Sequence, residues 1–129
     1  MTDFSVVICT YNGEHRLPLL LDKLRVQRLS QAITWEILIV DNNSHDQTAQ
    51  CIFTHQQQWP AHGAIRYIFE PRQGLAYARR CAMEVVTSEL VGFLDDDTLP
   101  ADDWVAQAYE FGQRHPQVGA YGSTINGLY

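Results

Sequence analysis

The chain alternates short apolar runs with stretches in which apolar residues recur every three or four positions. Runs of four to eight apolar residues bounded by turn residues are typical of buried strands, and the three-to-four spacing is typical of helices. The pattern predicts strands at 4–9, 35–40, 64–69, 90–94 and 117–121, and helices at 17–24, 44–57, 75–86 and 102–115. Ser44 and Gln47 have capping-box spacing, so Ser44 is predicted to open the second helix. Asp102 is predicted to cap the fourth helix, and Pro18 lies early enough in the first to be tolerated.

Strand–helix alternation of this kind predicts an α/β fold. We expect a Rossmann-like, mostly parallel sheet joined by right-handed crossovers, with helices on both faces. At 129 residues the chain is long enough for one domain with a substantial core, and it contains no repeat, low-complexity segment or linker.

Composition and charge narrow the class of protein. A formal net charge of −6 argues against nucleic acid or an anionic membrane surface as the main partner. No apolar run approaches the roughly 20 residues of a membrane span, and no signal peptide opens the chain. The three cysteines are widely spaced in apolar segments, which predicts buried, reduced thiols. We therefore expect a protein of the cytoplasm, without a transmembrane segment.

The apolar run 90–94 ends in three consecutive carboxylates, Asp95, Asp96 and Asp97. Open α/β sheets bind ligands at the carboxyl ends of their strands, which is where these aspartates are predicted to lie. Adjacent anions repel one another unless a cation neutralises them, and carboxylate oxygens suit Mg²⁺ or Mn²⁺. The alternative is a solvated acidic turn. Helix capping would account for one aspartate but not for three, so the sequence favours a divalent-metal site.

Polar turns also follow the first two predicted strands. Thr10, Tyr11 and Asn12 follow the first, and Asp41 ends the second. Because the carboxyl ends of parallel strands lie at one edge of a sheet, these residues are expected to converge with the aspartates on one crevice. Neither a dinucleotide-binding fingerprint nor a P-loop is present. A metal bridging aspartates to a diphosphate would replace such a glycine-rich cradle.

The same crevice has candidate groups for holding a nucleotide. Tyr11 would lie against a base, with partial core packing as the alternative, and Asp41 would accept a hydrogen bond from a base N–H. Gly74 opens a predicted helix whose N-terminus faces the crevice, so it would admit a phosphate or sugar closely. Arg79 would supply a positive charge that the crevice otherwise lacks, with a solvated helix face as the alternative. The five histidines show no metal-ligand spacing and are expected at the surface.

Four motifs occur in order along the chain, at 5–12 (SVVICTYN), 39–48 (IVDNNSHDQT), 74–79 (GLAYAR) and 93–98 (FLDDDT). Together they resemble the family-two inverting glycosyltransferases of the GT-A fold. The resemblance spans the whole chain, and four ordered motifs make it specific, whereas a lone D-x-D motif would be weak.

The resemblance implies a nucleotide-diphosphate-sugar donor, in the first place a UDP-sugar, and a divalent cation, Mg²⁺ or Mn²⁺. It implies inverting transfer to a hydroxyl of a glycan or lipid acceptor, as in polysaccharide biosynthesis, in the cytoplasm or at the cytoplasmic face of a membrane. The nucleotide-sugar-binding residues that it implies are Thr10, Tyr11, Asn12, Asp41, Gly74, Arg79, Asp95 and Asp96, and the metal ligands are Asp97 and Asp95.

The sequence departs from the family pattern in two places. Arg80 stands where the family usually has Asn. The chain ends at Tyr129, whereas family catalytic domains continue and carry the general base, an Asp or Glu, on a later segment. We therefore interpret residues 1–129 as the N-terminal, nucleotide-sugar-binding portion of a truncated glycosyltransferase domain, inactive or weakly active by itself. The last predicted strand lies at a sheet edge, which favours self-association into a homo-oligomer.

Two other functions remain open at this point. The segment 94–99 imitates the D-x-D-x-T motif of haloacid-dehalogenase-like phosphatases, but that fold places the motif on its first strand with a lysine downstream. Here three predicted strands precede the motif, and Lys23 lies upstream. The other alternative is a non-catalytic nucleotide-binding or interaction domain.

Overall fold

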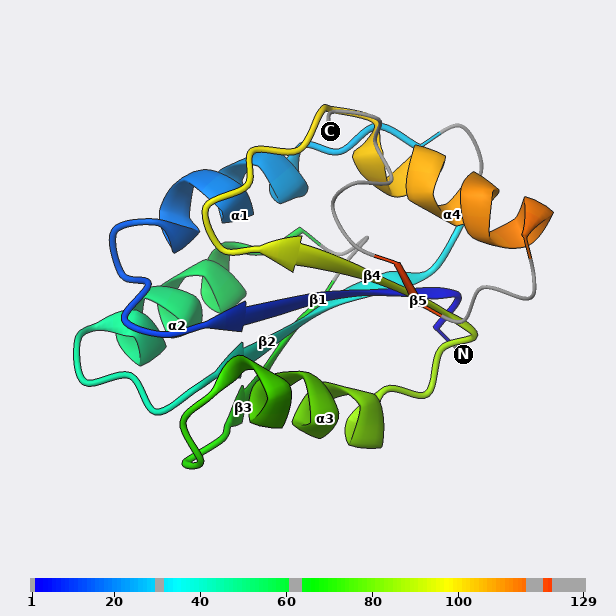
Figure 1. Cartoon of the computed structure of the whole chain (residues 1–129). Helices are drawn as coiled ribbons and strands as arrows, with labels where there is room; N and C mark the ends of the chain where they lie inside the picture. The colour runs from blue at the N-terminus through cyan, green and yellow to red at the C-terminus, as the bar shows by residue number, and fades with distance from the viewer. Residues whose placement is uncertain (1, 30–31, 61–63, 116–119, 122–129) are drawn as a thin grey trace.

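The computed structural model describes residues 2–29, 32–60, 64–115 and 120–121. They form an α/β fold with one five-stranded sheet in the order β3-β2-β1-β4-β5, in which every neighbouring pair is parallel (Figure 1). The strands are β1 (Phe4–Thr10), β2 (Trp35–Asp41), β3 (Ile65–Phe69), β4 (Leu90–Asp95) and β5 (Ala120–Tyr121). The helices are α1 (Leu17–Arg25), α2 (Thr48–Gln58), α3 (Leu75–Val85) and α4 (Trp104–Arg114). The predicted α/β class and parallel sheet are confirmed.

Helices cover both faces of the sheet, as the alternation predicted. On one face α1, α2 and α4 form a core with Val6 and Ile8 of β1, and on the other α3 packs with Val7 (Figure 1). Successive residues of a strand point to opposite faces, so β1 contributes to both cores. Every residue of β2 is buried. That pattern is typical of a parallel strand covered on both sides.

The leucine spacing after β1 produces α1. Leu17, Leu20, Leu21 and Leu24 are fully buried. Pro18 lies in the first turn, where its missing N–H removes no helical hydrogen bond. Burying one leucine side chain stabilises a fold by about 1.5–3 kcal/mol, so this apolar face fixes α1 on the sheet.

The predicted start of the second helix is wrong. α2 begins at Thr48, and Gln47 is its N-cap residue without a side-chain capping bond. The Ser44 hydroxyl instead accepts a hydrogen bond from the Asn12 backbone N–H at 2.8 Å. Ser44 therefore bonds to the loop after β1 and not to its own helix.

The predicted capping role of Asp102 is also wrong. α4 begins at Trp104, and Asp103 occupies the N-cap position with no side-chain capping bond. Of the predicted strand 117–121, the last two residues form β5, and residues 117–119 lie outside the described residues.

The structure also bears on the expected membrane spans, cysteines and histidines. Within the described ranges, none of the helices has the length and apolar character that crossing a bilayer requires. Cys9, Cys51 and Cys81 are free thiols, but each is half-buried and not fully buried. The prediction that the histidines lie at the surface is wrong for His55, whose side chain is 12% exposed and lies 3.8 Å from the Asp22 carboxylate. His62 lies outside the described residues.

Candidate functional site

The carboxyl ends of β1, β2 and β4 lie together at one edge of the sheet. The parallel register sets Thr10 beside Asp41 and Cys9 beside Asp95. Tyr11, directly after β1, is 41% exposed. The sequence predicted this convergence of strand ends. A pocket of about 140 Å³ opens here and is lined by Cys9, Thr10, Tyr11, Asn42, Leu75 and Ala78.

Asp41 is held in a fixed orientation at the end of β2. It is 2% exposed, and its carboxylate accepts hydrogen bonds from the Ser44 backbone N–H (3.0 Å) and the Tyr67 hydroxyl (2.7 Å). Tyr67, on β3, packs edge-on against Phe53 of α2 with 5.1 Å between ring centroids. Burial and the hydrogen bond to Asp41 raise the pKa of Tyr67, so its hydroxyl stays a donor. A carboxylate has about four acceptor positions and two are used here, but Asp41 is not among the residues that line the pocket, so its contact with a nucleotide stays a prediction.

Asn42 joins the end of β2 to the start of α3. Its side-chain amide donates to the backbone carbonyls of Glu70 (3.1 Å) and Arg72 (2.8 Å), and its oxygen accepts from the Gly74 N–H (2.9 Å). Gly74 has φ 140°, a conformation that favours glycine. The prediction that Gly74 admits a phosphate or sugar closely stays a prediction, and its own N–H is bonded to Asn42. Sequence reasoning did not select Asn42 as a site residue, and its one signal was its place in the polar turn after β2.

Asp95 and Asp97 are both exposed, and within the described ranges neither carboxylate bonds to another side chain. No group of three or more His, Cys, Asp or Glu side chains in the described part of the chain is arranged to hold a metal ion. Two free carboxylates nevertheless suit Mg²⁺ or Mn²⁺, because Mg²⁺ typically binds one or two carboxylates and is completed by substrate phosphates and water. The donor set therefore fits a divalent ion shared with a diphosphate.

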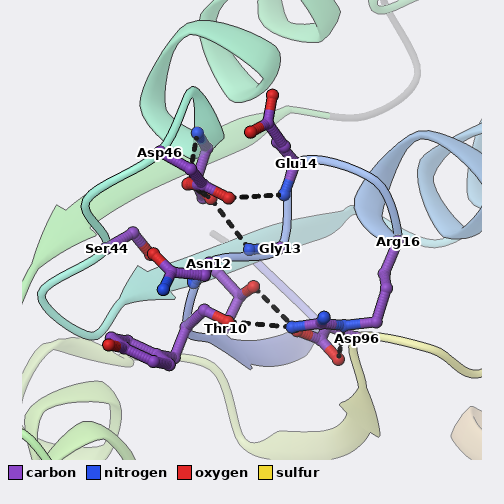
Figure 2. A network of polar contacts seen from close by, with 10 residues as sticks. Thr10, Asn12, Gly13, Glu14, Arg16, Ser44, Asp46 and Asp96 are labelled. Atoms are coloured by element: carbon purple, nitrogen blue, oxygen red, sulfur yellow. Dashed lines mark hydrogen bonds and ion pairs between the residues drawn. The ribbon is translucent and has the colours of Figure 1, made fainter.

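Asp96 differs from these two aspartates because it is paired with a cation. The Arg16 guanidinium donates from Nε to Oδ1 (3.0 Å) and from Nη2 to Oδ2 (2.9 Å), and the Thr10 hydroxyl donates to Oδ2 (2.8 Å) (Figure 2). The hydrogen bonds from Arg16 to Asp96 raise the pKa of Arg16. The prediction that the crevice lacks any positive charge other than that of Arg79 is wrong, because the Arg16 guanidinium also lies there. Arg79 itself is exposed, 5.8 Å from the ring centroid of Phe93.

The loops after β1 and β2 are bonded to each other (Figure 2). Consecutive N–H groups of the first loop donate to side chains of the second: Asn12 to Ser44 (2.8 Å), Gly13 to Thr48 (2.9 Å) and Glu14 to Asp46 (3.3 Å). The Asn12 side-chain oxygen accepts from the His45 N–H (2.8 Å). A Cβ at Gly13 would lie 2.1 Å from Thr10 Oγ1, so this close approach requires glycine. The structure places Asn12 in this network and not in the pocket lining, and its contact with a nucleotide stays a prediction.

The thiol of Cys9 forms part of the pocket wall. Burial, the largest cause, raises its pKa to about 11. At neutral pH the thiol is therefore protonated and is a poor nucleophile. The contribution of Cys9 to the pocket is its apolar surface.

Residues 5–127 match the family model described as glycosyl transferase family 2. The chain belongs to this family. The match covers all the strand ends described above, and it decides against the phosphatase alternative.

Curated relatives agree with the family match. An uncharacterized glycosyltransferase, YfnE of Bacillus subtilis, is 31% identical over 103 residues, which cover 80% of this chain and 25% of that protein. The dolichyl-phosphate beta-glucosyltransferase ALG5A of Trichomonas vaginalis is 32% identical over 99 residues, covering 72% of this chain and 30% of that protein. This family-2 chain thus spans about a quarter to a third of these relatives' length.

Solved structures share the fold. TarS of S. aureus (residues 1–349), in complex with UDP-GlcNAc, has a TM-score of 0.75 at 26% identity, covering 89% of this chain and 32% of that chain. The mannosyltransferase PcManGT from Pyrobaculum calidifontis, in complex with GDP-Man and Mn²⁺, has a TM-score of 0.72 at 28% identity, covering 80% of this chain and 30% of that chain. Both share the α/β architecture of this chain.

Proposed function

We propose that residues 1–129 form the donor-binding portion of a glycosyltransferase that moves a sugar from a nucleoside diphosphate to an acceptor hydroxyl, with inversion. The observation that carries the proposal is the pocket of about 140 Å³ at the carboxyl ends of β1 and β2. The exposed carboxylates of Asp95 and Asp97 follow the neighbouring strand β4. A nucleoside in the pocket would have its diphosphate near these carboxylates. The complexes of TarS with UDP-GlcNAc and of PcManGT with GDP-Man and Mn²⁺ support a donor of this class.

In this proposal the pocket residues hold the nucleoside. The exposed ring of Tyr11 lies against the base, and Thr10 forms the adjoining wall. The remaining lone pairs of Asp41 accept from a base N–H, because its carboxylate is already oriented by Ser44 and Tyr67. Asp41 accepts well but donates nothing while ionised, so it selects a base edge that carries an N–H. A UDP-sugar satisfies this requirement.

Asp95 and Asp97 would hold a divalent cation, Mg²⁺ or Mn²⁺, with Asp97 as the principal ligand. When bound, such an ion supplies Lewis-acid stabilisation of the charge that grows on the departing diphosphate. Gly74 and Arg79 do not line the pocket themselves, but they are the chain neighbours of its lining residues Leu75 and Ala78, and they are proposed to contact the sugar or phosphate. Asp96 links the turn after β4 to the end of β1 by accepting a hydrogen bond from the Thr10 hydroxyl.

Transfer also needs a general base to deprotonate the acceptor hydroxyl, which typically contributes about 10²–10⁴-fold to the rate. None of the described residues is assigned this role. Because the chain spans about a third of the TarS and PcManGT chains, we propose that the base and the acceptor wall come from outside residues 1–129. A glycan or lipid acceptor, in the cytoplasm or at the cytoplasmic face of a membrane, completes the proposal.

The test compares nucleotide binding by Asp97→Ala and the unmodified protein. Isothermal titration with UDP and GDP, each with and without Mn²⁺, should show metal-dependent binding that Asp97→Ala abolishes while the melting temperature stays unchanged. Asp102→Ala is the matched control, since Asp102 is exposed and 3.9 Å from its nearest cation, Arg28. Unchanged metal-dependent affinity in Asp97→Ala would overturn the metal assignment. No binding of any nucleotide by the unmodified protein would favour the non-catalytic interaction domain.

A further inference from the structure

The three adjacent aspartates after β4 are not equivalent. Asp96 accepts hydrogen bonds from Nε and Nη2 on one edge of the Arg16 guanidinium and a third from the Thr10 hydroxyl, so both of its oxygens are engaged by the protein. Its side chain is 15% exposed, compared with 43% for Arg16. Asp95 and Asp97 are exposed, without a side-chain partner among the described residues. One of the three negative charges is therefore neutralised by the protein itself.

The local fold fixes Arg16 in this position. The Gly13 carbonyl accepts from the Arg16 N–H (3.0 Å) and sets the turn that precedes α1. Arg16 Nη2 also donates to the backbone carbonyl of Tyr11 (2.8 Å). The guanidinium thus ties the end of β1 to the turn after β4. Figure 2 shows the guanidinium beside the Asp96 carboxylate.

Arg16 also lies near one of the two remaining carboxylates, that of Asp97. With Asp97 it lines a cavity of about 130 Å³, whose other walls are His15, Leu19 and Leu99. A fixed positive charge beside the same cavity lowers the affinity of any cation for Asp97. It also makes Asp96 a poorer metal ligand than its neighbours, since its charge is neutralised and three of its roughly four acceptor positions are taken by Arg16 and Thr10.

We propose that Arg16 is a positioning residue that keeps Asp96 out of the metal site and leaves two carboxylates, Asp95 and Asp97, to share a divalent ion with the donor diphosphate. The inference rests on the proposed donor site. Its consequence is that the site holds a metal ion weakly until a diphosphate arrives, because two carboxylates alone are a small ligand set for Mg²⁺ or Mn²⁺. Arg16 thereby makes metal binding depend on donor binding.

The experiment measures Mn²⁺ binding without nucleotide, by the electron paramagnetic resonance signal of free Mn²⁺. Arg16→Met keeps the length of the side chain and removes its charge. It should tighten Mn²⁺ binding roughly tenfold, the size that Coulomb's law gives for a divalent ion and one added unit charge about 5 Å away in a water-like medium. Arg16→Lys keeps the charge but cannot donate two parallel hydrogen bonds to Asp96. Its Mn²⁺ affinity should lie between those of the unmodified protein and Arg16→Met. A purely structural role for Arg16 would lower the melting temperature without tightening Mn²⁺ binding, and this result overturns the inference.

The double variant Arg16→Met/Asp96→Asn supplies an independent measurement. It removes the ion pair as a unit, so the net charge of the site and the two proposed ligands are unchanged. Replacing both partners of an ion pair is tolerated better than removing one, so this variant tests the inference even where Arg16→Met does not fold. Mn²⁺ affinity within about threefold of the unmodified protein supports the inference, and a larger loss shows that Asp96 is itself a ligand and overturns it.

Failure of this inference is distinguishable from failure of the proposed function. If UDP binds the unmodified protein with Mn²⁺ and not without it, the donor site stands whatever the Arg16 variants show. In Arg16→Met the ratio of UDP affinities with and without Mn²⁺ should fall, because Mn²⁺ binding then depends less on a bound diphosphate. An unchanged ratio overturns the role of Arg16 alone.

Discussion

Removing the Asn42 side chain should loosen the pocket and destabilise the whole protein. In Asn42→Ala the carbonyls of Glu70 and Arg72 and the N–H of Gly74 all lose their partner. Asn42 is 5% exposed, so water replaces these bonds incompletely. The connection from β3 to α3, which carries one wall of the pocket, is then held by the Asp41 carbonyl through the Glu70 N–H at 2.9 Å.

The magnitude follows from three hydrogen bonds of normal length. Each contributes a net 0.5–1.5 kcal/mol, so Asn42→Ala should lower the free energy of unfolding by about 2–4 kcal/mol. Asn42→Asp should cost more than alanine at neutral pH, because a carboxylate would face the carbonyls of Glu70 and Arg72, which cannot donate to it. The new carboxyl would have a raised pKa in the folded protein, so its penalty should shrink as the pH falls towards about 4.

Urea denaturation followed by circular dichroism gives the free energies, at pH 7 and again near the ordinary pKa of aspartate. Gln47→Ala is the control, since this exposed residue makes no capping bond and should change stability by less than about 0.5 kcal/mol. UDP affinity should fall in Asn42→Ala and not in Gln47→Ala. An Asn42→Ala protein within about 1 kcal/mol of the unmodified protein, or an aspartate variant as stable as the alanine one, would refute the reasoning.

Four further predictions follow from other parts of the molecule. Gly92→Ala should destabilise the protein by about 1–3 kcal/mol in the same urea assay, because its Cβ would lie 2.8 Å from Phe4 Cζ and 3.1 Å from the Trp104 ring. Asp41→Ala should weaken nucleotide binding in calorimetry without metal as well as with it, and an effect confined to the metal-dependent part would mean that the pocket is misplaced. With the other two cysteines changed to serine, alkylation of Cys9 should keep accelerating up to about pH 11, since its pKa is raised to about 11, and a rate that levels off near pH 9 would contradict the burial argument. The 129-residue chain should bind UDP but transfer no sugar at an enzyme-like rate in a radiolabelled-donor assay, and should form some dimer at high concentration in sedimentation; efficient transfer would require a general base within these residues.

The sequence was sufficient for the architecture because the fold depends on local apolar periodicity. The leucine spacing of α1 and the apolar run at 37–40 in β2 each predict one element without knowledge of the others. Parallel topology then brings Thr10, Asp41 and Asp95 to one edge whatever the side-chain details. This is why the candidate site was visible before any distance was known.

What the sequence could not predict are the partners chosen across long separations. Arg16 and Asp96 are 80 positions apart, and no spacing rule connects them. Ser44 has the right neighbours for a capping box, but the Asn12 N–H, 32 positions away, binds its hydroxyl. Asn42 was overlooked for the same reason, since its bonds go to backbone groups whose positions only the folded chain defines. In each case a local preference yields to a tertiary contact.

The bonded pair of loops beside the crevice has a consequence for how the protein moves. Three consecutive amides, at positions 12 to 14, are held by side chains at positions 44 to 48. Loop amides usually exchange with deuterium at almost the rate of free peptides, but these require both loops to open together. They should therefore exchange as one cooperative unit, with protection approaching that of the β1 amides. A crevice bordered by such a unit has its shape before any ligand enters, so less ordering entropy opposes binding on this side.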